Sequence, residues 1–247
     1  MFSRPSSRVL VPALSFFLSA VCGFAGPTPE ELAYRMQRAV LGTQDLAEIQ
    51  QILKLGFDVN APIGCGTFSS VNGAVHVGNV AMLQLLLKAG ARPRSLDDAA
   101  FHANPETAYA MTKALLEAGA DANRKIYYMN DPVKHPVPMS TPLHRAAWRG
   151  NLKVVELLLQ EPGVEVDVMN MDGSTALMSA VAKENDDVVR VLLDHGANPK
   201  LQNNKGRSAI DVAQDAIRKR EATLRMLSDA PAPARKEGAG LTSTAQP

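Results

Sequence analysis

The sequence is poor in the residues that would cross-link or strongly charge a protein. It has 2 cysteines in 247 residues, so the stability of the fold must come from its core rather than from disulfide bonds. Lysine and arginine number 26 and aspartate and glutamate 25, which excludes both the basic field that suits nucleic acid and an acidic field that suits a cationic partner. Aromatic residues make up 5%, whereas 46% of the residues are hydrophobic. The chain can bury a sizeable core, and we expect a partner to be recognised by shape and local contacts.

The longest apolar run lies at the N-terminus and is too short to span a membrane. Arg4 and Arg8 precede the run, which extends from Val9 to Val21, and small residues follow up to Ala25. A membrane helix needs about 18 or more apolar residues, whereas a positive start, a short apolar run and a small-residue end are typical of a secretory signal peptide. We therefore predict that residues 1–25 are a signal peptide and that the mature chain is exported and soluble.

The two cysteines carry separate expectations. Cys22 leaves with the signal peptide; the alternative is a lipoprotein cut before Cys22, which is disfavoured because Val21 stands where that signal takes a small residue. Cys65 then has no partner for an intramolecular disulfide. We expect it to be a small semi-buried residue near a turn, with a reactive or interchain thiol as the alternative.

A leucine pair followed by Gly-Ala recurs along the chain. It occurs in LLLKAGARP, LLEAGADAN and LLDHGANPK, where the glycines are Gly90, Gly119 and Gly196. A second pattern, NMDGSTALMSAV, which contains Gly173, reappears as NNKGRSAIDVA, which contains Gly206. The spacing within both patterns fits a period of roughly 33 residues, which indicates an array of structural repeats.

Each repeat is predicted to contain two short amphipathic helices. In STPLHRAAWRGNLKVVELLLQ, one apolar stripe precedes the Gly150-Asn151 break and a second stripe follows it. Thr141 and Pro142 suit the start of a helix, and the glycine of Gly-Ala suits its end. Neither helix is long enough to be stable alone in water, so neighbouring repeats must cover the apolar faces.

These stretches resemble the ankyrin repeat, whose unit is a hairpin finger, two antiparallel helices and a loop. We therefore expect an all-α ankyrin-repeat solenoid over residues 26–230, built from about six helix-turn-helix units with short hairpin fingers. The third unit lacks the Thr-Pro-Leu-His start, and the first and last read as polar caps. Residues 231–247 lack apolar periodicity and are predicted to be a disordered tail. The units are expected at residues 28–60, 61–94, 95–123, 124–170, 171–202 and 203–230.

The resemblance implies a structural role for His144. This histidine follows Thr-Pro-Leu, and in the family it ties neighbouring turns together by hydrogen bonds; its counterparts here are Met178 and Asp211. His195 is expected to cap a helix end. The other histidines lack metal-ligand spacing, and we find no phosphate loop, nucleophile elbow or paired-carboxylate motif. We predict no catalytic residue, no metal and no cofactor.

Trp148 and Arg149 stand just before the glycine that ends a first helix. Ankyrin-like stacks present this surface as a concave binding face, where an aromatic and an arginine suit an interface anchor. The alternative is that Trp148 only packs beside a helix and Arg149 is a solvated charge. Counting back equally from the breaks of the other units adds His76 with Val77, Pro105 with Glu106, and Ala182 with Lys183. From this row we predict that Trp148, Arg149, His76 and Lys183 contact a partner.

Residues 124–139 form an insertion where a short finger is expected. Tyr127, Tyr128 and three prolines make an extended, semi-rigid loop, and loops on a rigid scaffold commonly carry recognition. The alternative is a finger that folds back over the neighbouring units. We predict that Tyr127 and Tyr128 belong to the partner-binding surface.

Together these features favour a non-enzymatic protein-binding module that is a monomer, with another protein as its partner, no nucleic acid and no membrane span. A signal peptide before ankyrin-like repeats resembles small exported ankyrin proteins of Gram-negative bacteria, which implies a periplasmic location and a periplasmic partner. The resemblance implies two roles, immunity to a secretion-system toxin and support of a protective periplasmic enzyme such as a catalase. The alternatives are a secreted ankyrin effector that acts outside the cell and an enzyme with an unrecognised site.

Overall fold

The computed structural model describes most of the chain after the predicted signal peptide. The predicted signal peptide, Cys65, the tyrosines Tyr127 and Tyr128 of the insertion, and the predicted tail lie outside the described residues. The described ranges are residues 26–63, 68–125 and 140–228.

Within these ranges the secondary structure is helical, apart from a single antiparallel bridge between Ile63 and Phe68. The helices follow one another in pairs along the chain, so the expected all-α solenoid is confirmed. The elements are α2 (Pro29–Arg38), the π-helix η1 (Ala39–Thr43), α3 (Leu46–Lys54), α4 (Ser70–Val77), α5 (Val80–Lys88), α6 (Leu96–Ala100), α7 (Pro105–Glu117), α8 (Pro142–Arg149), α9 (Leu152–Leu159), α10 (Ala176–Ala182), α11 (Asp186–Asp194) and α12 (Ala209–Ser228).

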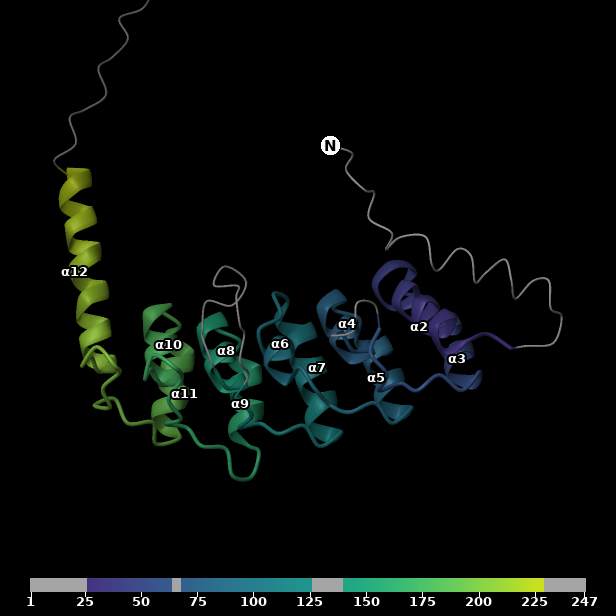
Figure 1. Cartoon of the computed structure of the whole chain (residues 1–247). Helices are drawn as coiled ribbons and strands as arrows, with labels where there is room; N and C mark the ends of the chain where they lie inside the picture. Colours follow the sequence, from purple (N-terminus) through teal and green to yellow (C-terminus); the bar gives the residue numbers. More distant parts are fainter. Residues whose placement is uncertain (1–25, 64–67, 126–139, 229–247) are drawn as a thin grey trace, which may run out of the picture.

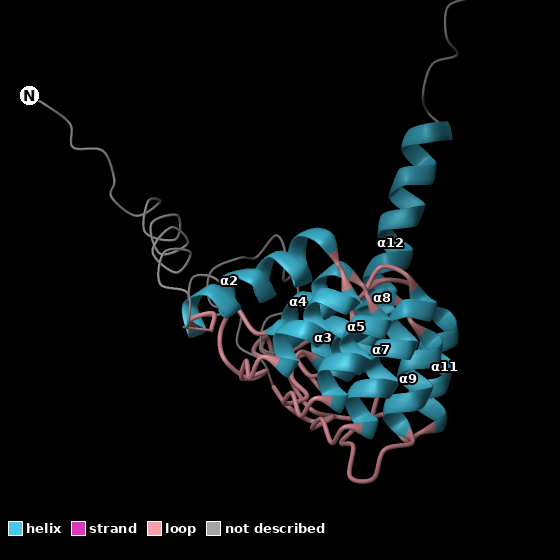
Figure 2. Ribbon diagram, turned by 90° about the vertical axis from the view of Figure 1, so that its right-hand side faces the viewer, coloured by secondary structure: helices cyan, strands magenta, loops and turns pink. Residues whose placement is uncertain are grey.

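The helix pairs stack side by side into a shallow arc (Figure 1). The first helices of the pairs, α4, α6, α8 and α10, form the inner row, and the second helices, α5, α7, α9 and α11, form the outer row. Viewed along the stack, the helices lie on one side and the connecting loops gather on the other (Figure 2). Each helix is therefore covered by its own partner and by the neighbouring pairs, which is how short helices become stable.

Polar side chains start the helices, and left-handed residues end the inner ones. Thr175 Oγ1 accepts the Met178 N–H at 3.3 Å at the start of α10, as expected for a capping hydroxyl. Gly150 ends α8 with φ of +75°, and a Cβ there would lie 2.7 Å from Asn185 Oδ1. Glycine is required at this position both for its backbone angle and for the close approach of the next unit.

Asparagines at the starts of the outer helices join neighbouring units. Asn185 Nδ2 donates to the carbonyl oxygens of Ala147 at 2.8 Å and Trp148 at 3.3 Å. Asn151 Nδ2 donates to the Ala100 carbonyl oxygen at 2.9 Å. These bonds satisfy carbonyls that a helix end leaves without intrahelical partners. They also hold the C-terminal ends of α6 and α8 in fixed positions along the inner row.

The last unit differs from the expectation. Residues 203–230 were expected to form a helix-turn-helix, but α12 is one helix of 20 residues, Ala209–Ser228. Its sequence contains no glycine-asparagine pair that would break it into two. In Figure 1, α12 stands upright at the end of the arc and extends beyond α10 and α11. The arc is therefore closed at this end by a projecting helix rather than by a complete unit.

The third unit corrects one step of the residue count. Its first helix, α6, has only 5 residues and starts at Ser95, whose φ is +65°. Asn104 caps α7 by accepting the Thr107 N–H at 3.0 Å, so Pro105 and Glu106 begin α7 and do not belong to the inner row. The count misplaced them because this unit has no glycine break to count from. Alignment on the capping asparagines places Phe101 and His102 in the row instead.

Candidate protein-binding groove

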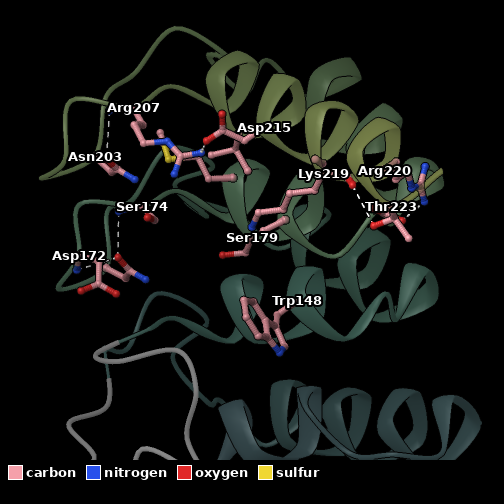
Figure 3. A pocket seen from close by; sticks show the side chains of 16 residues that line it. Trp148, Asp172, Ser174, Ser179, Asn203, Arg207, Asp215, Lys219, Arg220 and Thr223 are labelled. Atoms are coloured by element: carbon pink, nitrogen blue, oxygen red, sulfur yellow. Dashed lines mark hydrogen bonds and ion pairs between the residues drawn. The ribbon is translucent and has the colours of Figure 1, made fainter. Parts of the chain in front are cut away.

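A groove of about 820 Å³ lies between the inner row and α12. Figure 3 shows Trp148 on one side of it and side chains of α12 on the other, with Ser179 and Lys219 between them. We call this space the groove. Its lining residues are Trp148, Asn170, Asp172, Ser174, Met178, Ser179, Ala182, Glu184, Asn203, Arg207, Val212, Asp215, Ala216, Lys219, Arg220 and Thr223.

Trp148 is the aromatic side chain of this lining. It is half-buried at the last turn of α8, where Asn185 holds its backbone carbonyl. The Lys183 ammonium lies 4.0 Å from the centre of its ring, a cation–π contact. The structure thus brings together two residues that the sequence placed in one row, and leaves part of the indole open to the groove.

The other candidate residues lie away from the groove. The exposed guanidinium of Arg149 lies 5.0 Å from the centre of the Phe101 ring, so Arg149 extends toward the third unit. His76 is exposed on α4 and meets the edge of Phe68 with the ring centres 6.5 Å apart. His76 is on the same inner row as Trp148, with α6 between their helices. Tyr127 and Tyr128, as noted, lie outside the described residues.

Charged side chains cross the groove from α12 to the stack. Arg220 pairs with Glu184 at the end of α10, and Arg207 pairs with Asp215 of α12. Both pairs are partly exposed, so each contributes only about 0–1 kcal/mol to stability. Lys219 also lines the groove, and its ammonium forms no ion pair with the described residues. It is available to a carboxylate of a partner.

Glu184 was missed by the sequence reasoning, although its place in the repeat could have revealed it. It directly precedes the capping Asn185, where the units of α4 and α8 carry Gly78 and Gly150, and its φ is +58°. A side chain in this left-handed conformation costs on the order of 1 kcal/mol. Since a glycine could not reach Arg220, the glutamate replaces a free backbone angle with a contact to α12.

His144 sits behind the groove and supports its wall. It is 1% exposed, and its Nε2 lies 3.0 Å from the carbonyl oxygen of Ser174, a groove residue. Its Nδ1 lies 2.8 Å from Thr141 Oγ1. Burial lowers the pKa of His144 from 6.5 to about 4, so the ring is neutral at neutral pH. Nε2–H then donates to Ser174 and Nδ1 accepts from Thr141, which confirms the expected structural role.

A buried ion pair joins the third and fourth units. Arg145 is 2% exposed; its Nε donates to the Asp97 carbonyl oxygen at 3.1 Å and lies 3.8 Å from the Asp97 carboxylate. Its Nη2 donates to Asp98 Oδ1 at 3.2 Å, and its guanidinium stacks 4.4 Å from the centre of the Phe101 ring. Phe101 therefore contacts Arg145 as well as Arg149. Sequence pattern alone does not reveal this pair, because its partners lie in different units, far apart along the chain.

Two further features bear on the kinds of chemistry available. In residues 26–63, 68–125 and 140–228, no three histidine, cysteine, aspartate or glutamate side chains gather as metal ligands would. Over the same ranges, no helix has the length and apolar character needed to cross a membrane. His195 acts at a helix end as expected, with its Nδ1 2.8 Å from the Val191 carbonyl oxygen.

Stacked helix pairs with an open groove on the inner row define a helical repeat solenoid, a class that presents extended surfaces to other molecules. The family described as ankyrin repeats (3 copies) matches residues 71–170 and 143–234, and the chain belongs to the ankyrin-repeat family. It is accordingly a protein–protein interaction module.

Similar proteins come from viruses, bacteria and animals. An ankyrin repeat protein of Acanthamoeba polyphaga mimivirus is 29% identical over 114 residues, 46% of this chain and 67% of that protein. The ankyrin repeat protein YahD of Escherichia coli (strain K12) is 28% identical over 135 residues, 43% of this chain and 67% of that protein. Protein phosphatase 1 regulatory subunit 12A of Mus musculus is 34% identical over 85 residues, 34% of this chain and only 8% of that protein.

Proposed function

We propose that this protein is exported to the periplasm, where it binds a segment of another protein in the groove without catalysing a reaction. The observation that carries the proposal is Trp148, a half-buried aromatic side chain on the wall of an open groove whose other residues are largely polar or charged. Binding energy at protein interfaces concentrates in such aromatic anchors, and the polar residues around them exclude water.

The groove also suits a charged segment. Lys219 offers an ammonium without an ion-pair partner among the described residues, and Lys183 lies over the Trp148 ring. An apolar side chain of the partner would pack on the indole, and a neighbouring carboxylate would meet Lys219. Acid and base at fixed positions give such a site selectivity and steer association more than they raise affinity.

The periplasmic location rests on the N-terminal signal pattern of residues 1–25. Within that compartment the two roles remain immunity to a secretion-system toxin and support of a protective enzyme such as a catalase. One relative is named a regulatory subunit of protein phosphatase 1, a name that describes action on another protein. The alternatives are an effector that acts outside the cell and an enzyme with an unrecognised site. Co-purification from periplasm, together with the identity of the neighbouring genes, separates these roles.

The binding surface is tested by calorimetric titration of the co-purified partner. Trp148→Ala should weaken binding by about 2 kcal/mol or more, because it removes the aromatic anchor. His76→Ala, on the same inner row but outside the groove, is the matched control and should have little effect. Arg149→Ala should cost at most about 1 kcal/mol if the side chain stays at the rim.

The double change Tyr127→Ala/Tyr128→Ala tests whether the insertion contributes, with an expected loss of about 2 kcal/mol or more. Urea unfolding of each variant separates lost binding from lost folding. Unchanged affinity for Trp148→Ala, with the fold intact, would move the interface away from the groove. An equal loss for His76→Ala would extend it along the whole inner row.

A further inference from the structure

The face of α12 that points away from the groove carries two exposed isoleucines. Ile210 is 46% exposed and Ile217 is 57% exposed. They are seven residues apart, so they lie within about 20° of each other around the helix axis and two turns apart along it. Val212, Ala216 and Thr223, which line the groove, lie on the other side of α12. We call the side with Ile210 and Ile217 the outer face of α12.

This outer face is not the surface that the end of a stack needs. A terminal unit of a solenoid remains soluble by presenting polar residues outward, because no further unit covers it. Here an apolar pair points outward, and its seven-residue spacing is that of a helix that packs along another helix. In Figure 1, α12 also extends past α10 and α11, so its C-terminal part has no described helix beside it.

The charge distribution along α12 identifies the occupant. Its first nine residues carry two acids, Asp211 and Asp215, and no base. Its remaining eleven residues carry four bases and one acid, a net charge of +3. A second α12 laid antiparallel would place the acidic half of each copy against the basic half of the other, with Ile217 at the centre of the pair. A parallel arrangement would oppose like charges.

We propose that two copies of this protein associate through the outer faces of α12, packed antiparallel. A 20-residue helix is about 30 Å long and 10 Å wide, so a helix pair buries on the order of 1,000 Å² in total. That area lies at the low end for specific interfaces, so the dimer is weak and depends on concentration. Since the groove is on the opposite side of α12, the pair leaves both grooves open, and the proposal is independent of what they bind.

Sedimentation velocity of the purified protein over about a hundredfold range of concentration tests the proposal. We expect the mass to rise from that of one chain toward two. Ile217→Asp should weaken self-association by at least about tenfold, because a charge at the centre of the pair must be desolvated. Leu193→Asp is the matched control: Leu193 is 43% exposed on α11, and its change should leave self-association unaltered. Circular dichroism checks that each variant is folded.

Cysteine cross-linking tests the orientation, on a background in which both native cysteines are changed to serine. Ile217→Cys should join two copies by a disulfide, whereas Ile210→Cys should not, because the two copies of residue 210 lie about 20 Å apart in the antiparallel pair. Cross-linking at both positions would indicate a parallel pair and overturn the proposal. A single-chain mass at every concentration, as the sequence suggested, or a dimer that survives Ile217→Asp would also overturn it.

Discussion

His144 makes the stability of the stack depend on pH. The folded state holds its pKa at about 4, whereas the unfolded chain has the ordinary value of 6.5. As pH falls below 6.5, the unfolded state takes up a proton that the buried ring refuses until about pH 4. The contribution of the neutral ring is therefore complete above pH 6.5 and is lost progressively as pH falls toward 4.

The free energy of unfolding should fall by about 2 kcal/mol from this group alone between pH 7 and pH 5. Urea unfolding at the two pH values measures it. His144→Met places the residue of the next unit, Met178, at the same position and removes the titrating ring. This variant should lose stability at pH 7, because Ser174 and Thr141 lose a hydrogen-bond partner, and it should show a flatter pH dependence. An equally steep pH dependence in this variant would contradict the assignment to His144.

Single residues also divide what sequence could foresee from what it could not. The role of His144 and the place of Trp148 before Gly150 follow from local spacing, because a repeat brings equivalent positions to the same place in every unit. The contact of Lys183 with Trp148 follows from the same row. Glu184 and Arg145 were missed, since their partners lie in other units and only the stacked fold brings them together.

At the scale of helices, Arg145 of α8 holds the short α6 in place. Arg145→Met should lower the free energy of unfolding by about 3–5 kcal/mol, because the fully buried carboxylate of Asp97 would lose its guanidinium partner. Arg149→Met is the matched control, since Arg149 is exposed and stacks on the same Phe101 ring; its cost should stay within about 1 kcal/mol.

Urea unfolding measures both arginine variants, and hydrogen exchange locates the loss in or near α6. Similar costs for the two variants would mean that stacking on Phe101 contributes more than the buried ion pair. A loss confined to other helices would mean that α6 does not depend on Arg145.

Most helices were predictable because their starts, ends and apolar stripes are local signals. Thr175 caps α10 and Gly150 ends α8 as the sequence indicated, and Leu158 and Leu192 are fully buried. The exceptions have physical causes. No break interrupts α12, so a pattern of paired helices does not apply to it, and the third unit lacks the glycine from which its inner row was counted. The groove could not be foreseen, because it exists only where α12 stands against α10.

At the scale of the whole molecule, export should shorten the chain. If residues 1–25 are a signal peptide, mass spectrometry of the product recovered from the periplasm should give a chain that begins at Gly26, without a lipid. A product that begins at Cys22 and carries lipid would make the protein membrane-anchored instead of soluble. A product that retains residues 1–25 in the cytoplasm would remove the basis for a periplasmic role.

The short α6 gives the arc an uneven stiffness. With only 5 residues and a left-handed start at Ser95, it packs against α8 more extensively than against α4. When the stack is bent or pulled from its ends, it should yield first between α4 and α6, since the weakest interface opens at the lowest force. The molecule then behaves as two stiff springs joined in series: the segment carrying His76 swings, while the groove beside Trp148 keeps its shape.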